Sequence, residues 1–137
     1  MRQFIDIIES SALQRPRVFY RGTNLESKER ISTGNNTWDG YLFCADSIKQ
    51  ASNYGRTIER ITAQADAKIL YEGTRDFIRL KSGIKMNDGM LDWAAAIVSR
   101  AKEDGYDAVW FKMQGNIGTV IINQDKFIRE PNFTTLL

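Results

Sequence analysis

The spacing of apolar residues along the chain predicts an alternation of short helices and strands. Near the start, apolar positions recur at helical spacing and predict an amphipathic helix over residues 2–14, packed on the domain. The apolar run that follows predicts a strand over 17–21, with Phe19 and Arg21 on one face. Residues 25–39 are polar, and the segment 32–39 within them is predicted to be a mobile loop.

A second apolar run, residues 41–45, predicts a strand that leads directly into a short helix. Either Asp46 or Ser47 can cap this helix, because both side chains accept hydrogen bonds from the free N–H groups of a first turn. Gly55 stands where a residue that ends a helix is expected. Strand, cap and helix stop together predict one strand-to-helix unit over residues 40–55.

The second half of the chain continues the alternation. Thr74 is predicted to cap a short helix, and Asn87 or Asp88 a longer one. The predicted elements are strands over 57–63 and 68–71, a helix over 74–80, a longer helix after Asp88, a strand from 105 to 111, and a last long strand over 119–123 before Phe127 and Ile128.

Composition narrows the class of protein. A chain of 137 residues, 42% hydrophobic and 26% charged, predicts a single ordered domain over residues 1–137. The net charge of +2 is too small to favour a nucleic-acid partner, which needs Lys and Arg clustered on one face. The first residues lack the apolar core of a signal peptide and no apolar run approaches about 18 residues, so neither export by that route nor a membrane span is expected.

Cys44 is the only cysteine, and the chain has no histidine. An intramolecular disulfide, a thiolate-rich zinc site and histidine metal ligands are therefore excluded, and no metal is expected. A single thiol fits a reducing compartment, so the expected location is the cytoplasm.

Two stretches carry a resemblance to a known family. The first is Val-Phe-Tyr-Arg-Gly-Thr at residues 18–23, and the second is Gly-Tyr-Leu-Phe-Cys-Ala-Asp at 40–46, followed by a helix that ends in Asn-Tyr at 53–54. In this order they resemble the NAD-binding core of ADP-ribosyltransferases, where a Tyr-[Arg/His]-Gly-Thr strand lies next to a Gly-x-x-Phe-x-Ala-Asp strand. The spacing from Asp46 to Tyr54 resembles the form seen in poly(ADP-ribose) polymerases.

The rest of the chain extends the resemblance. Gly-Tyr-Asp-Ala-Val at residues 105–109 and Val-Ile-Ile-Asn at 120–123 resemble the closing half of the same fold. The resemblance covers residues 17–71 and 104–128 and is closest to small phage-type members, including the anti-CRISPR ADP-ribosyltransferases. It implies an α+β fold whose split, mostly antiparallel β core has flanking helices and holds the co-substrate NAD in a cleft.

The resemblance also implies which aromatic residues grip the cofactor. Tyr54 matches a tyrosine that stacks on the nicotinamide ring, and an aromatic face against a flat, electron-poor ring is a sound clamp. Phe43 stands where some members carry a second stacking tyrosine. A phenylalanine there can stack on the ring but cannot hydrogen-bond.

The end of the first strand supplies the remaining expected contacts. Gly22 has no Cβ, so its N–H and C=O can approach the nicotinamide amide, although a glycine here also suits a simple turn. Arg21 can bind the ribose or pyrophosphate of NAD, although it can equally be a surface arginine. Tyr20 and Thr23 flank them in the same motif and belong to the implied cofactor site.

The chain departs from the family where a catalytic acid is expected. Breaking the nicotinamide–ribose bond builds positive charge on the sugar, which a carboxylate should stabilise. The family places that acid at the start of the last long strand or just before it, but residues 114–119 contain no Asp or Glu. Gln114 is the nearest isostere and is assigned the acid's place, whereas Gly118 aligns with the family's strand-start glutamate.

These observations give one functional hypothesis and two rivals. The resemblance implies mono-ADP-ribosyl transfer from NAD to a macromolecular acceptor, a host protein, by a phage-encoded modifier or inhibitor of a host defence protein such as a CRISPR component, acting in the host cytoplasm. The missing acid favours instead a pseudoenzyme that binds NAD or ADP-ribose without transferring it. A protein-interaction inhibitor with no nucleotide dependence is the third hypothesis.

Overall fold

The computed structural model describes residues 15–23, 41–84, 90–113 and 116–136. The predicted helix 2–14, the predicted loop 32–39 and Gln114 lie outside these ranges. In chain order the elements are β1 (Val18–Thr23), β2 (Leu42–Ala45), α3 (Ile48–Ala51), the 3₁₀ helix η2 (Ser52–Tyr54), β3 (Thr57–Ala63), β4 (Ile69–Tyr71), α4 (Arg75–Lys81), α5 (Met90–Glu103), β5 (Ala108–Met113), β6 (Asn116–Ile121), the 3₁₀ helix η3 (Gln124–Lys126) and β7 (Phe127–Thr135).

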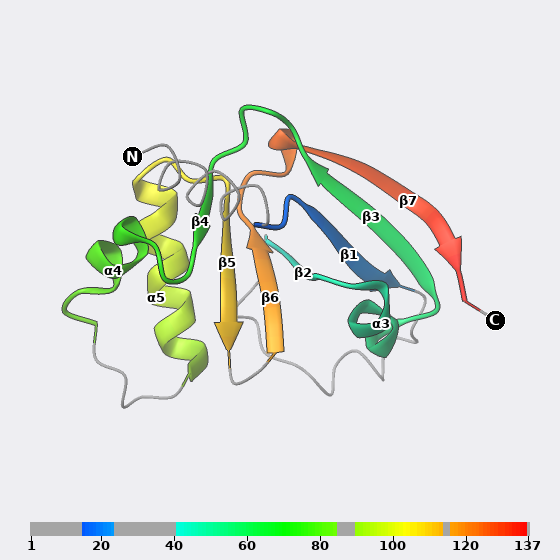
Figure 1. Cartoon of the computed structure of the whole chain (residues 1–137), viewed down its shortest axis with the longest axis horizontal. Helices are drawn as coiled ribbons and strands as arrows, with labels where there is room; N and C mark the ends of the chain where they lie inside the picture. Colours follow the sequence, from blue (N-terminus) through cyan, green and yellow to red (C-terminus); the bar gives the residue numbers. More distant parts are fainter. Residues whose placement is uncertain (1–14, 24–40, 85–89, 114–115, 137) are drawn as a thin grey trace, which may run out of the picture.

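The strands of the described residues form one seven-stranded sheet in the order β4-β5-β6-β2-β1-β3-β7 (Figure 1). Neighbouring strands are antiparallel except β4 and β5, which are parallel. The predicted α+β fold with a mostly antiparallel sheet is therefore confirmed.

A short connection forces this sheet to curl. β3 and β4 are five strand positions apart, which in a flat sheet means about 24 Å at the usual strand spacing. Residues 64–68, which join them, reach at most ~20 Å, and a turn that pairs Ala67 N–H with the Gln64 carbonyl shortens that reach. The strands therefore bend round so that the connection can pass from β3 to β4, as seen at the top of Figure 1.

The curl gives the sheet an inner face with its own apolar core. Along β1 and β3, Phe19 and Ile61 lie opposite each other on this face, and both are fully buried. The core on the inner face draws residues from all seven strands and from the β3–β4 connection: Phe19, Cys44, Ile61, Ala67, Ile69, Tyr71, Ala108, Ile121 and Phe127.

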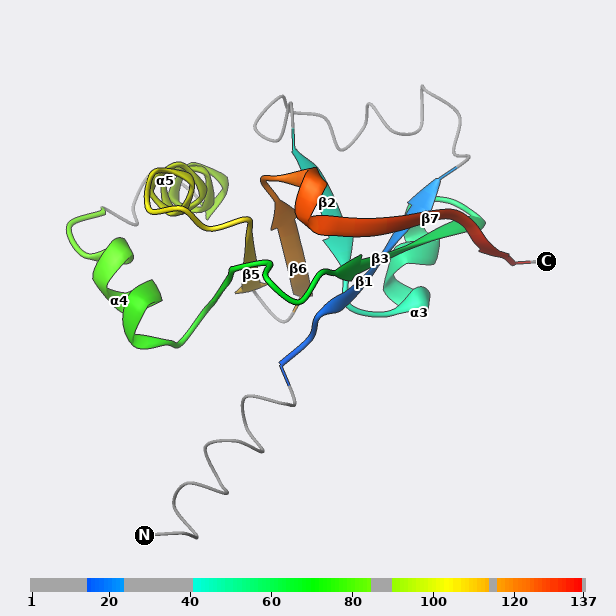
Figure 2. The ribbon, with the colours of Figure 1, turned by 90° about the horizontal axis from the view of Figure 1, so that it is seen from above.

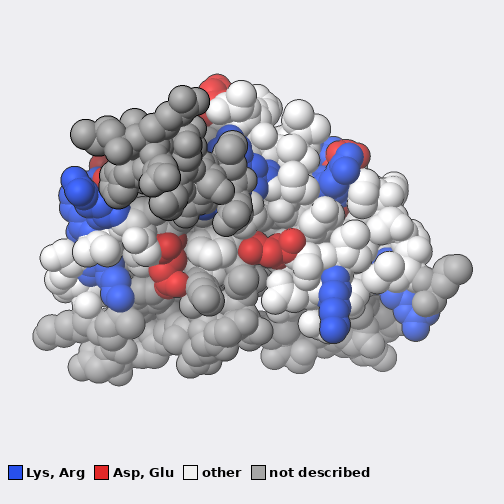
Figure 3. Space-filling model, in the orientation of Figure 1, with Lys and Arg blue, Asp and Glu red and all other residues white. Residues whose placement is uncertain are grey.

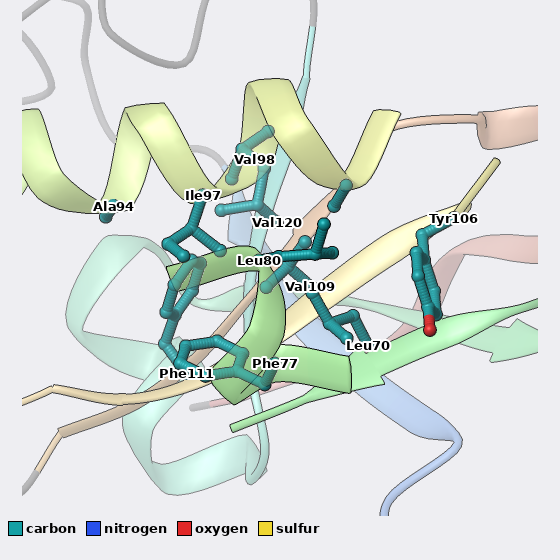
Figure 4. Packing of buried hydrophobic residues seen from close by; sticks show 11 residues of the cluster. Leu70, Phe77, Leu80, Ala94, Ile97, Val98, Tyr106, Val109, Phe111 and Val120 are labelled. Atoms are coloured by element: carbon teal, nitrogen blue, oxygen red, sulfur yellow. The ribbon is translucent and has the colours of Figure 1, made fainter. Parts of the chain in front are cut away.

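The opposite face, the helix face, carries the three described α-helices, with α4 and α5 at one end of the sheet and α3 at the other (Figure 2). Along β5, Val109 and Phe111 turn away from the inner face and pack against α4 and α5. Figure 4 shows Ala94, Ile97 and Val98 of α5 above these strands. At the other end of the sheet, a smaller cluster of Ala45, Ala51, Ile58, Tyr20 and Ile48 holds α3 against β1 and β3.

The helix caps follow the sequence closely. Ser47, not Asp46, caps α3, because its Oγ accepts a hydrogen bond from Gln50 N–H at 3.1 Å. Thr74 caps α4 through Phe77 N–H, as predicted. Asn87 and Asp88, the expected caps of α5, lie outside the described residues.

The end of the chain differs from the prediction. The strand expected over 119–123 is β6, which begins and ends earlier, at Asn116 and Ile121. It is followed by a further strand, β7, of nine residues. The sequence did not predict β7 because it contains Pro131, and proline cannot donate a hydrogen bond to a strand ladder. It is tolerated because β7 is an edge strand and its register with β3 shifts between Ile58 and Arg60, opposite the proline.

One acid secures the connection that forces the curl. Asp107 N–H donates to the Lys68 carbonyl at 2.7 Å, while its Oδ2 accepts from Lys68 N–H at 2.8 Å. Asp107→Ala leaves the Lys68 N–H without this partly buried hydrogen bond and should lower the free energy of unfolding by about 1–3 kcal/mol, measured by urea denaturation. Asp125→Ala, on the exposed η3, is the control and should change it by less than about 0.5 kcal/mol. Equal effects would mean that Asp107 does not secure the connection.

Candidate functional site

The ladder between β1 and β2 is interrupted, and this split is the candidate site. The two strands share a single register pair, Tyr20 with Ala45, whereas β1 pairs with β3 along its whole length. Extending the same register would set Gly22 opposite Phe43, but no pair forms there. Strand β1 therefore brings the end of the Tyr-Arg-Gly-Thr motif to the split, and strand β2 brings Phe43, the predicted stacking residue.

A cluster of charges lies on the inner face beside the split. The Arg21 guanidinium is 3.6 Å from Glu59 Oε1, and Glu59 lies opposite Arg21 in the β1–β3 register. The Glu59 side chain is only 2% exposed, while that of Arg21 is 31% exposed. Arg129 of β7 donates from Nε to Glu59 Oε2 at 2.8 Å and from its second amino group to Oε1 at 2.9 Å. The buried carboxylate is thus bracketed by two cations.

Cys44 lies on the same face and is chemically quiet. Burial raises the pKa of its thiol to about 12. The positive charge of nearby Arg21 lowers this pKa, but by less than burial raises it. The thiol therefore stays protonated at neutral pH, and the protonated form is a poor nucleophile.

Gly22 is required by the helix that crosses β1. A Cβ at this position would lie 2.0 Å from the Ala51 carbonyl oxygen, so no other residue fits under the junction of α3 and η2. Gly55, with φ +153°, also lies close to β1: a Cβ at Gly55 would lie 1.6 Å from the Thr23 carbonyl oxygen. This close packing brings η2, with the 43% exposed Tyr54, against β1.

Phe43 lies on the helix face, where its ring covers β6. A Cβ at Gly118 would lie 2.5 Å from Phe43 Cζ, so the ring fills the space above this glycine. A side chain at Gly118 would require the ring to move. The position that aligns with the family's strand-start glutamate is therefore occupied by an aromatic ring.

The other predicted motif residues have structural partners. Tyr20 packs with the α3 cluster, and its ring centroid lies 6.3 Å from that of Phe133. Thr23 Oγ1 donates to the Thr57 carbonyl at 3.1 Å, which ties the ends of β1 and β3. Both residues border the split through strand β1, while Gln114 lies outside the described residues.

Asp46 has a role that the sequence did not indicate. Its Oδ2 accepts a hydrogen bond from Trp110 Nε1 at 2.8 Å, and burial raises its pKa. Its Oδ1 and Thr119 Oγ1 are buried and have no hydrogen-bond partner within the described ranges. The inner face therefore holds polar groups as well as an apolar core.

The structure brings to Arg21 an acid that was not predicted. Glu59 was part of a predicted strand without a stated role, and its signal in the sequence is a charge that shares a strand face with the apolar Ile61. Its partner Arg129 is 70 residues away, so no local pattern announces the pair. Elsewhere, basic and acidic side chains are interspersed on the described part of the surface in Figure 3.

Comparisons with known proteins give a fold likeness. No protein family and no curated protein matches the chain. One solved structure, described as that of an anti-CRISPR protein, has a TM-score of 0.54 at 15% identity, covering 82% of this chain and 93% of that one. The M. tuberculosis MbcT–MbcA toxin–antitoxin complex gives a TM-score of 0.44 at 15% identity, covering 88% and 80%. The first likeness supports the fold alone.

No helix in the described parts of the chain is long and apolar enough to cross a membrane.

The state of Cys44 can be measured directly. Because the raised pKa keeps the thiol protonated and the side chain is 1% exposed, iodoacetamide at pH 8 should leave the native protein unlabelled for hours. The same reagent in urea, where the thiol regains its ordinary pKa, should label it fully, as followed by mass spectrometry. Equal rates in the two states would show that Cys44 is accessible and ionised in the fold.

Proposed function

We propose that the chain binds NAD at the β1–β2 split and uses it for mono-ADP-ribosyl transfer to a macromolecular acceptor, a host protein. One observation carries the proposal: where the ladder is interrupted, the two bordering strands carry a half-buried arginine on the inner face, a glycine backbone, and an aromatic ring on the helix face. An anionic dinucleotide with a flat carboxamide ring needs these three kinds of group.

Each residue has a distinct role in this proposal. The Arg21 guanidinium lies 3.6 Å from Glu59 Oε1 and its side chain is 31% exposed, so with respect to the described residues it has donors left for ribose or phosphate oxygens. Gly22 offers its backbone to the carboxamide. Phe43 and the partly exposed Tyr54 stack on the nicotinamide from β2 and η2.

The proposed chemistry lacks an open carboxylate among the described residues at the split. Glu59 is closest to Arg21, but Arg129 binds both of its oxygens. Asp46 accepts from Trp110 at Oδ2, and its Oδ1 is buried rather than open to a ligand. We therefore expect the chain to bind NAD but to transfer ADP-ribose slowly. The lack of an open carboxylate favours an NAD-binding pseudoenzyme as the second candidate.

The structural likeness supports one biological setting for this proposal. The solved structure with the similar fold is described as an anti-CRISPR protein, so a CRISPR component is the first acceptor or target to test. Mass spectrometry of host proteins after exposure to the chain and NAD would identify a modified acceptor. Capture of a partner without any NAD dependence would support the protein-interaction inhibitor instead.

NAD binding is tested by titration calorimetry. Arg21→Ala should weaken binding about 10- to 100-fold, because it removes charge-assisted hydrogen bonds. Tyr54→Ala removes one stacking face and should weaken binding about three- to tenfold. Ile78→Ala, on the exposed surface of α4, is the control and should bind like the wild type. If the wild-type protein shows no heat of binding, or if all three variants bind alike, the split is not an NAD site.

The position of the acid is tested by two substitutions. Gln114→Glu should raise transfer by about 10² to 10³ with little change in NAD affinity, because a charge near the sugar acts on the transition state. Gly118→Glu should instead weaken NAD binding, because its Cβ would displace the Phe43 ring. Labelled NAD with host lysate measures transfer for both. Gain of transfer by Gly118→Glu alone would place the acid on β6 and contradict this assignment.

A further inference from the structure

The last strand of the chain contributes a side chain to the charge cluster at the split. Arg129, on edge strand β7, grips Glu59 with two parallel hydrogen bonds of 2.8 and 2.9 Å. Its remaining amino group donates to Gln124 Oε1 at 3.0 Å, which fixes the guanidinium from its other side. This fork geometry is the strongest form of arginine–carboxylate pairing.

Glu59 cannot be left without a partner. Its side chain is 2% exposed, and an isolated buried carboxylate is strongly unfavourable. Two cations face it: Arg129 in hydrogen-bond contact, and Arg21 at 3.6 Å from Oε1. The third close group, Cys44, is neutral because burial raises its pKa. Within the described part of the chain, Arg21 is therefore the cation placed to replace Arg129 as the partner of Glu59.

We infer that Arg129 is a positioning residue: by saturating Glu59, it keeps the guanidinium of Arg21 free to bind a ligand at the split. Without Arg129, the buried carboxylate draws Arg21 into a two-pronged pair on the inner face, and the donors of Arg21 are lost to the site. The expected effect on NAD binding rests on the proposed function. The competition between the two arginines for Glu59 is independent of it.

The sheet provides a matched control. Arg60 and Glu130 form a second two-pronged pair between the same strands, β3 and β7, with hydrogen bonds of 2.9 and 3.0 Å. Arg60 follows Glu59 in β3 and points to the opposite face. Arg60→Ala therefore removes an ion pair of the same geometry, but with a more exposed carboxylate, between β3 and β7 without touching the charge cluster.

The test is NAD calorimetry on four variants. Arg129→Ala should weaken NAD binding about tenfold, and Arg129→Lys, which keeps the charge but loses the fork, should weaken it less. The double variant Arg129→Ala/Glu59→Gln removes the competing charge and should return to within about threefold of the wild type. Arg60→Ala should bind like the wild type. Rescue of NAD binding in the double variant also follows from a purely structural role of Arg129, because Glu59→Gln removes the unpaired buried charge. The Arg21 signal described next separates the two roles, because a structural role does not trap Arg21.

A second readout does not depend on NAD. The Nε–Hε signal of Arg21 in ¹H–¹⁵N spectra should exchange with solvent more slowly in Arg129→Ala, where Arg21 is trapped by Glu59, and should return to the wild-type rate in the double variant. If wild-type protein does not bind NAD but this pattern appears, the proposed function fails and the inference stands. Unchanged Arg21 exchange in Arg129→Ala, or a double variant that binds NAD as weakly as the single one, would overturn the inference.

Discussion

The short connection between β3 and β4 constrains everything else in the fold. Residues 64–68 cannot span a flat sheet, so the sheet bends until its two ends approach each other. Bending buries one face without any of the described helices, and a core drawn from every strand fills it. The same bending accompanies the interrupted ladder in the middle of the sheet, where β1 and β2 share only the pair Tyr20 and Ala45. The fold thus creates its candidate site by the way in which it closes its core.

The inner face combines apolar packing with buried charge, and the charge is balanced locally. Glu59 is held by Arg129 and approached by Arg21, whereas Cys44 between them stays neutral. A buried ion pair of this kind is weak evidence for added stability, because desolvation offsets the attraction. The role that we infer for the Glu59–Arg129 pair is to keep the Arg21 guanidinium in position at the interrupted ladder. This distinguishes it from the more exposed Arg60–Glu130 pair on the same strands.

Local patterns made much of the fold predictable. The strand-to-helix unit with its Ser47 cap, the Thr74 cap and the alternating strands depend on neighbours in sequence, and the structure contains them. Long-range partners were not predictable. Glu59 and Arg129 are 70 residues apart, and Gly22 is required by the Ala51 carbonyl that crosses above it. β7 was missed because its proline lies in an irregular part of an edge strand, a situation that only the sheet order reveals.

The central claim is that the interrupted ladder between β1 and β2 is where a ligand binds. Backbone amide ¹H–¹⁵N shifts during NAD titration test this residue by residue. The account predicts the largest shifts at residues 21–23 and 42–44, with Tyr54 also affected and α4 unchanged. Shifts concentrated on α4 and β4, or no saturable shifts at NAD concentrations in the millimolar range (about 4 kcal/mol of binding free energy), would contradict it.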